Sequence, residues 1–313
     1  MSTSTPQLNG SLFGYAQLVR LPNLFTAIAD PLMGALFVLP VDQSPDMWLL
    51  ASVGSAACLL YAGGVVLNDV FDARRDERER PERPIPSGNV PREAAKLLAM
   101  GLLAAGVLVG FMAALLIGHF GPAVMVLLLA GCIVLYDGYA KLTPFGPPVM
   151  GLCRALNVLL GMSLMTTPWQ VQHWLVAAAV GVYITGISYF SRGEARTSRR
   201  PVLVLGLAII LGGIGLLALL PLTETALVAL LVAQPERWYF LMAMLGLLIG
   251  WRFFRAVLDP EPGPVQQAVG HGILSLVLLD AAVVYAVRGM PSAVMVLALV
   301  IPAMFLGRVM RMT

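Results

Sequence analysis

The most polar stretch of the sequence, residues 68–76, places one amide and three carboxylates at helical spacing. At about 100° per residue, Asn68, Asp69, Asp72 and Asp76 fall within about a quarter of a helix circumference. Carboxylates packed this closely repel one another unless a cation or a proton lies among them. Oxygen ligands suit Mg²⁺, which binds one or two carboxylates together with substrate phosphates. The spacing therefore predicts a site for a magnesium–diphosphate complex.

The alternative is a solvated helix end in which acids and bases neutralise one another, since residues 68–96 hold seven of each. Within this stretch, residues 80–89 contain three prolines and a glycine and cannot continue a helix. A helix is expected to restart near Pro91, with Glu93 in its first turn. The segment is either a stiff loop that folds back over the carboxylates or an ordinary connector.

The elements that position these residues must lie in a membrane. Of the 313 residues, 58% are hydrophobic and 12% are charged, and the mean hydropathy is +0.84. Soluble domains carry about 25% charged residues, so a soluble globule is excluded. A net charge of +3 gives no basic face, and nucleic acid is not an expected partner. The chain is predicted to be an integral membrane protein.

The apolar windows predict an all-α, polytopic transmembrane bundle of nine or ten spans in a single domain, residues 1–313. A span needs roughly 20 mostly apolar residues, and the continuous apolar runs exclude the alternating strands of a barrel. The stretch 224–233 is apolar but too short to span. The windows are 20–40, 48–68, 94–117, 120–138, 148–166, 173–191, 201–221, 236–257, 266–287 and 291–308.

The distribution of Lys and Arg predicts the orientation. The polar segment 1–19 does not resemble a signal peptide. If this segment is cytoplasmic, Arg237 and Arg288 are the only basic loop residues on the opposite side of the membrane. Both termini and the polar loops are then expected in the cytoplasm, most simply at a bacterial inner (plasma) membrane. The cytoplasmic side receives Arg20, residues 74–96, Lys141, residues 192–200, Arg252, Arg255, Arg308 and Arg311.

Two polar residues in the fifth window, Arg154 and Asn157, lie on one helix face at i and i+3. A charge at membrane depth is costly and usually faces the bundle interior. Arg154 is expected to contact Glu194, Asp137 or a bound diphosphate, or to form a structural ion pair. Asp30 and Asp280 are isolated acids in other windows, and Asp30 is the better site candidate.

The polar residues 68–88 resemble a motif of a known family. The pattern Asn68-Asp69-x-x-Asp72-x-x-x-Asp76, followed by a loop from Arg83 to Gly88, resembles the first aspartate-rich motif of the UbiA superfamily. The members of this superfamily are intramembrane prenyltransferases, which join an isoprenyl diphosphate to a lipophilic, often aromatic, acceptor. Further resemblances are the segment from Leu18 to Asn23 at the first window and Tyr136 with Lys141 after the fourth.

The resemblance implies roles for individual residues. Mg²⁺ would be held by Asn68, Asp72 and Asp76, with Asp69 nearby, and Lys141 would contact the diphosphate. Asp72, Asp76 and Lys141 would therefore be catalytic, and the prenyl tail would reach between helices toward membrane lipid. The expected substrate-binding residues are Arg20, Asn23, Arg74, Tyr136, Arg154, Asn157, Tyr189 and Arg192.

The resemblance weakens at residues 189–200, where the family has a second aspartate-rich motif. This stretch holds one carboxylate, Glu194, and four arginines. Glu194 would provide a weaker metal ligand, and Arg192 would share in phosphate binding. Three interpretations stay open: one-metal diphosphate binding, an altered acceptor pocket, or lost catalysis. Residues 151–157 and 191–194 together resemble a divergent branch found in bacterial secondary-metabolite gene clusters, the ebo type.

The sequence offers two rival functions. A CDP-alcohol phosphatidyltransferase is rejected, because Asp137 begins only a fragment of its motif and the later aspartates are missing. The other alternative is a non-catalytic membrane protein, a transporter or a lipid-binding partner in a biosynthetic cluster. Against it, the first motif is intact and no inverted repeat is visible.

Overall fold

The computed structural model describes residues 8–41, 44–194, 196–223 and 234–311, and this part of the chain is helical, without strands. The expected all-α membrane bundle is confirmed. The stretch 224–233 and residues 1–7 lie outside the described residues. The first helices are α1 (Leu8–Leu18), α2 (Leu21–Val38), α3 (Met47–Glu79), α4 (Arg92–Ile117), α5 (Gly121–Gly138), the 3₁₀ turn η1 (Ala140–Leu142) and α6 (Gly146–Met162). The others are α7 (Val171–Phe190), α8 (Arg200–Ala218), η2 (Leu220–Thr223), α10 (Pro235–Leu258), α11 (Pro262–Arg288), α12 (Met290–Leu297) and α13 (Val300–Arg311).

Nine helical segments of the described chain are long and apolar enough to cross a membrane. Each coincides with an expected window, and the last combines α12 and α13. The remaining window, 148–166, coincides with α6, which has 17 residues and packs against α2, α5 and α7. Since a straight span needs roughly 20 residues, the tenth segment is a shorter helix inside the bundle.

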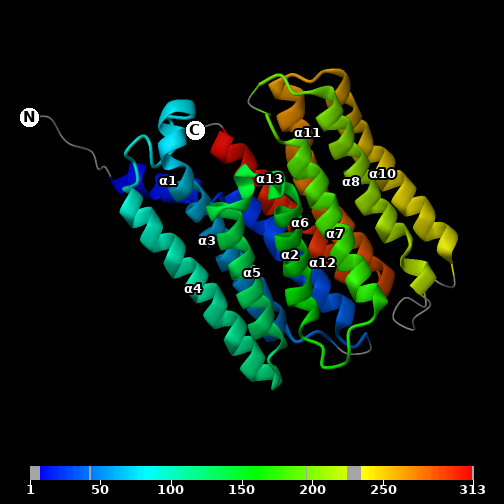
Figure 1. Cartoon of the computed structure of the whole chain (residues 1–313). Helices are drawn as coiled ribbons and strands as arrows, with labels where there is room; N and C mark the ends of the chain where they lie inside the picture. The colour runs from blue at the N-terminus through cyan, green and yellow to red at the C-terminus, as the bar shows by residue number, and fades with distance from the viewer. Residues whose placement is uncertain (1–7, 42–43, 195, 224–233, 312–313) are drawn as a thin grey trace, which may run out of the picture.

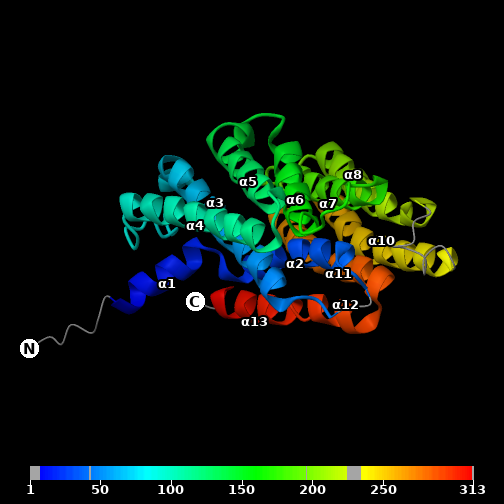
Figure 2. The same ribbon diagram turned by 90° about the horizontal axis from the view of Figure 1, so that it is seen from below.

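Successive long helices alternate in direction, so the loops that follow α3, α5 and α7 lie at the same end of the bundle (Figure 1). Contacts join these loops, because Lys141 in η1 reaches Asp72 on α3 and Arg192 donates to the carbonyl of Thr143. Figure 2 shows α12 and α13 across one side of the bundle, where both pack against α2. The end that carries these loops is called the polar end below.

Helix α3 carries the regularly spaced carboxylates beyond the hydrocarbon region. It begins after Asp46, whose side chain accepts a hydrogen bond from the Trp48 amide at 2.8 Å, and it ends at Glu79, shortly before Pro81. Its 33 residues correspond to about 50 Å, whereas the hydrocarbon core is about 30 Å thick. The last turns of α3 therefore extend to the polar end as a continuous helix, as the sequence predicts.

Small residues allow neighbouring helices to approach closely. A Cβ atom at Gly161 of α6 would collide with the carbonyl oxygen of Pro31 in α2. Between α7 and α8, a Cβ atom at Gly213 would lie 2.7 Å from the backbone nitrogen of Tyr183. Within lipid the hydrophobic effect does not drive helices together, so close van der Waals packing of this kind stabilises their association. They fix the frame that surrounds the site.

Two adjacent glycines of α8 give a test of this packing. Gly213→Ala should lower the stability, because overpacking against a rigid backbone costs about 1–3 kcal/mol. Gly212→Ala is the matched control: its Cβ would meet nothing within 4 Å, and alanine gains about 0.5–1 kcal/mol over glycine in a helix. Thermal unfolding of both variants in one detergent measures the difference. Equal unfolding temperatures would contradict the close contact of α7 and α8.

Candidate active site

The carboxylates of α3 form a buried row at the polar end. Asp69, Asp72 and Asp76 expose 7%, 7% and 2% of their surfaces. They follow Asn68 on one face of the continuous helix, as their spacing predicts. Burial of like charges is unfavourable unless each has a partner, so the surrounding basic residues determine whether the row is stable.

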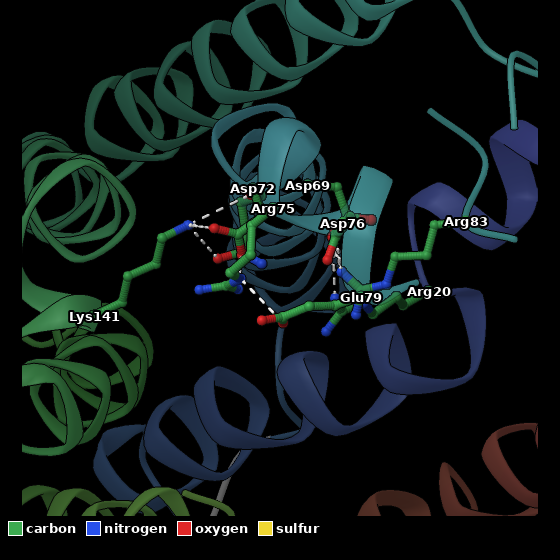
Figure 3. A network of polar contacts seen from close by, with 9 residues as sticks. Arg20, Asp69, Asp72, Arg75, Asp76, Glu79, Arg83 and Lys141 are labelled. Atoms are coloured by element: carbon green, nitrogen blue, oxygen red, sulfur yellow. Dashed lines mark hydrogen bonds and ion pairs between the residues drawn. The ribbon is translucent and has the colours of Figure 1, made fainter. Parts of the chain in front are cut away.

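Two arginines reach the row from one side (Figure 3). Arg83 Nη1 donates to Asp76 Oδ2 at 2.7 Å and lies 3.4 Å from Asp69 Oδ1. Arg20 Nη2 donates to the same Asp69 oxygen at 3.2 Å. Arg83 belongs to the proline-rich loop between α3 and α4, so the loop does fold back over the carboxylates.

A lysine reaches the row from the other side (Figure 3). Lys141 Nζ, on the η1 turn between α5 and α6, lies 2.8 Å from Asp72 Oδ1 and donates to Asn68 Oδ1 at 3.0 Å. Arg75, one turn along α3, also donates to Asp72 at 2.9 Å. Arg75 Nε also lies 3.7 Å from Glu79 Oε2. The row is thus electrically balanced by basic residues from four segments.

Local backbone geometry places two of these arginines. Arg20, between α1 and α2, has φ 48° and ψ 54°, and it is the one non-glycine residue with positive φ in the described chain. This left-handed conformation is strained for a side chain with a Cβ. In the loop of Arg83, Gly88 takes φ 78°, and the helix α4 restarts at Arg92 with Pro91 as its cap. The sequence predicts this restart within one residue.

A cavity of about 350 Å³ lies beside the row, enclosed by α2, α3, α5, α6, α7 and α11. Its walls are largely apolar and include Leu129, Ile133 and Ile184. Polar side chains line it in two places. At the polar end these are Arg20, Asn68, Asp137 and Glu194, and deeper in the bundle they are Tyr61, Arg154 and Asn157.

The deep polar group is a buried ion pair. Arg154 Nη1 donates to Asp30 Oδ2 at 2.8 Å and to the Thr26 carbonyl at 3.1 Å. Asn157 donates to the same carboxylate oxygen at 2.9 Å, and Arg154 lies over the ring of Tyr61 at 5.6 Å. Of the contacts considered for Arg154, the structure shows the ion pair, with Asp30 as its partner. Arg154 also lines the cavity, and its hydrogen bonds to Asp30 and Thr26 fix the orientation of its guanidinium group.

The segment after α7 brings one carboxylate to the cavity. Gly193 has φ 87°, a backbone conformation that residues with a side chain rarely adopt. The next residue, Glu194, lines the cavity. Burial raises the pKa of the Glu194 carboxyl above its usual value, while Arg80 and Arg20 act in the opposite direction. The segment is fastened to the η1 turn by Arg192, which donates to Thr143.

The structure brings many, but not all, of the expected site residues together. Arg74 is exposed on α3, since it points away from the face that carries Asp72. Tyr189 and Arg192 stack on each other, with 5.6 Å from the guanidinium carbon to the ring centroid, and both lie outside the cavity lining. Expected substrate-binding residues that line the cavity are Arg20, Asn23, Tyr136, Arg154 and Asn157.

Several residues of the site have no assigned role from the sequence, among them Tyr61, which lines the cavity. Arg83 was noted only as part of a motif, although its position beside the prolines indicates a fixed loop. Arg75 is i+3 from Asp72 and could have been found by helical spacing alone. Asp137 lines the cavity and exposes 4% of its surface. The sequence suggests it only as one possible contact of Arg154 and as part of an incomplete phosphatidyltransferase motif.

The donors at the polar end suit Mg²⁺ in type, since they are carboxylate and amide oxygens. Within the described residues, no group of three or more His, Cys, Asp or Glu side chains is arranged to hold a metal ion. The aspartates of the row point toward arginine and lysine instead. Because Mg²⁺ usually keeps several waters and binds substrate phosphates, the residues fit an ion that is bound together with a diphosphate.

Comparison with known proteins decides the family. The sequence model of the UbiA prenyltransferase family matches residues 31–277, which is most of the chain. The chain belongs to this family. The match extends from α2 into α11 and includes the carboxylate row, η1 and the segment of Glu194.

Similar sequences and structures agree with this assignment. The digeranylgeranylglyceryl phosphate synthase of Ignicoccus hospitalis is 38% identical over 122 residues, 39% of each chain. The matched part of this UbiA-family chain thus spans about two fifths of that relative's length. A structure of digeranylgeranylglyceryl phosphate synthase has a TM-score of 0.62 at 19% identity and covers 90% of this chain and 99% of the other. An Archaeoglobus fulgidus UbiA homologue bound to GPP and Mg²⁺ has a TM-score of 0.61 at 14% identity, covering 88% and 100%.

The ion pair of Arg83 with Asp76 can be tested in this UbiA-family chain without any ligand. Arg83→Gln should destabilise the free protein, because an unpaired buried acceptor costs about 1–3 kcal/mol and a charged one more. Adding Asp76→Asn should recover part of the loss, since the buried charge is then removed. Thermal unfolding of the single and double variants gives the coupling. If the double variant is as unstable as the sum of both single variants, the pairing is wrong.

Proposed function

We propose that the chain is a magnesium-dependent prenyltransferase that transfers a prenyl group from an isoprenyl diphosphate to a lipophilic acceptor within the membrane. One observation supports this most: the carboxylate row and Lys141 contact Arg20 and Asn68, which line the polar end of a largely apolar cavity inside the bundle. Charges suited to a metal and a diphosphate thus adjoin a space suited to a hydrocarbon chain.

The basic residues of the row would bind the diphosphate. Lys141, Arg20 and Arg83 offer N–H donors at the end of the cavity, and guanidinium groups bind phosphate oxygens in bidentate fashion. The Mg²⁺ ligands would be drawn from Asn68, Asp69, Asp72, Asp76 and Glu194. When bound, Mg²⁺ would neutralise charge that develops on the departing diphosphate.

The apolar walls would protect the reaction from water. The side chains of Leu129, Ile133 and Ile184 surround the space next to the polar end, where an allylic cation would form as the diphosphate departs. Exclusion of water prevents its capture before the acceptor reacts. Tyr61, Arg154 and Asn157 would hold the polar group of the acceptor deeper in the cavity.

The names of the archaeal relatives support a first choice of substrates, a geranylgeranyl diphosphate and a glyceryl phosphate lipid. We also propose that the polar end faces the cytoplasm, together with both termini, because almost all Lys and Arg gather there. The bacterial inner membrane expected from the sequence stays a prediction, since the relatives named above are archaeal.

Donor binding is tested by thermal unfolding with dimethylallyl, geranyl, farnesyl and geranylgeranyl diphosphate, with and without Mg²⁺. A ligand at a hundredfold excess over its dissociation constant should add about 2.7 kcal/mol. This stabilisation should require Mg²⁺ and disappear in Asp72→Asn. Glu93→Gln, on the exposed first turn of α4, is the control and should respond like the wild type. No stabilisation at any chain length would contradict the proposal and favour the non-catalytic alternative, a transporter or lipid-binding partner.

Turnover gives a separate test of Lys141. With geranylgeranyl diphosphate and a glyceryl phosphate lipid, Lys141→Met should lower kcat by roughly 10²–10³-fold, as for loss of a donor to developing negative charge. Lys96→Met, on an exposed position of α4, should keep wild-type kcat. Product formation is followed by chromatography of the extracted lipids. Equal rates for both variants would show that Lys141 does not act on the diphosphate.

A further inference from the structure

Asp137 is a buried acid that the structure leaves without a partner. It lies in the last turn of α5, exposes 4% of its surface and lines the cavity. Among the described residues, no side chain forms an ion pair or a hydrogen bond with its carboxyl group. A buried carboxylate in this situation is costly, and such groups are concentrated at functional sites.

The charged surroundings of Asp137 offset only part of this cost. The charged groups that act on it are Lys141, Asp72, Arg20 and Asp69. Both cations are already engaged, Lys141 by Asp72 at 2.8 Å and Arg20 by Asp69 at 3.2 Å. The C-terminal end of a helix is also the negative end of its dipole. Lys141 and Arg20 favour the charged form of Asp137 from a distance, whereas burial, Asp72 and Asp69 oppose it, and no basic side chain of the described residues pairs with it directly.

Two other oxygen donors line the cavity at the same end. Asn68 comes from α3 and Glu194 from the segment after α7, so with Asp137 they represent three separate elements. Asp69, Asp72 and Asp76, which pair with arginine and lysine, are not part of this lining. Asn68 lines the cavity and accepts a hydrogen bond from Lys141 at 3.0 Å. The cavity therefore has its own set of two carboxylates and one amide.

We propose that Asp137, with Asn68 and Glu194, binds a divalent cation on the cavity side of the diphosphate. This inference rests on the proposed function, because the diphosphate and water complete the coordination of the ion. Hard oxygen donors of this kind suit Mg²⁺ and Mn²⁺. The cation supplies the positive charge that Asp137 lacks in the free protein, and it places that charge where the bond to the prenyl group breaks.

The position of Asp137 argues against a role in binding the acceptor's polar group. Asp137 is one residue from the end of α5 and four residues before Lys141. The deep polar residues Arg154 and Asn157 instead lie in the middle of α6 and face Asp30. Asp137 is thus at the end where the diphosphate would bind.

The test uses Mn²⁺ as the probe, followed by electron paramagnetic resonance of the full-length protein with saturating geranyl diphosphate. Asp137→Asn should raise the dissociation constant of Mn²⁺ at least about tenfold, the lower limit found for loss of a supporting group at a metal site. The unfolding temperature without ligands should be unchanged or higher, because a buried charge without a partner is removed. Asp137→Glu should restore part of the affinity, and Glu93→Gln should match the wild type.

Each other result overturns a defined part of the argument. Wild-type affinity for Mn²⁺ in Asp137→Asn would exclude Asp137 as a ligand, whereas the proposed function would stand. A lower unfolding temperature of the free variant would mean that Asp137 is structural. If Asp137→Asn does not fold, Glu194→Gln tests the same set of donors and should also weaken Mn²⁺ binding. A wild-type protein that binds no Mn²⁺ with the diphosphate would contradict the proposed function itself.

Discussion

The polar end of this bundle depends on the neutralisation of three buried carboxylates on one helix. Asp69, Asp72 and Asp76 expose less than a tenth of their surfaces, and charges removed from water must be paired. The partners come from the turn between α1 and α2, the proline-rich loop, η1 and α3 itself. A single electrostatic requirement thus holds together segments that are far apart in the sequence, and it explains why a loop rich in proline and glycine has a defined path.

Buried charges must also be neutralised deeper in the bundle, where the pairing fixes a residue of the cavity wall. Arg154 is neutralised by Asp30 and supported by Thr26, so its guanidinium is fixed at the cavity wall. Close contacts between α2 and α6 at Gly161 keep these two helices near enough for the pair to form. The polar contacts therefore depend on small residues as much as on charges. Asp137 and the fully buried Asp280 of α11 are exceptions to this rule. Of the two, Asp137 lines the cavity, and a buried acid at a cavity wall is a reason to look for a ligand.

The sequence predicted those features that follow from local periodicity. The carboxylate row, the spans and the restart of α4 all result from spacing within one segment. Pairing across segments was not predictable, because Arg154 and Asp30 are 124 positions apart and no local rule connects them. Arg74 was expected at the site in place of Arg75, although spacing from Asp72 favours Arg75. Burial of Asp137 depends on the packing of six helices around the cavity, which no pattern in the sequence expresses.

Pairing in the free protein also constrains how a donor would bind. The row and Glu79 carry four negative charges, which Arg20, Arg75, Arg83 and Lys141 balance. Mg²⁺ alone would add positive charge to a balanced cluster, and a diphosphate alone would add negative charge beside three carboxylates. With both bound, the basic side chains would be free to pair with phosphate oxygens, and the carboxylates would be free to hold Mg²⁺. Each ligand would then raise the affinity for the other by the same factor, so the proposed magnesium dependence would follow from the charge balance of the cluster.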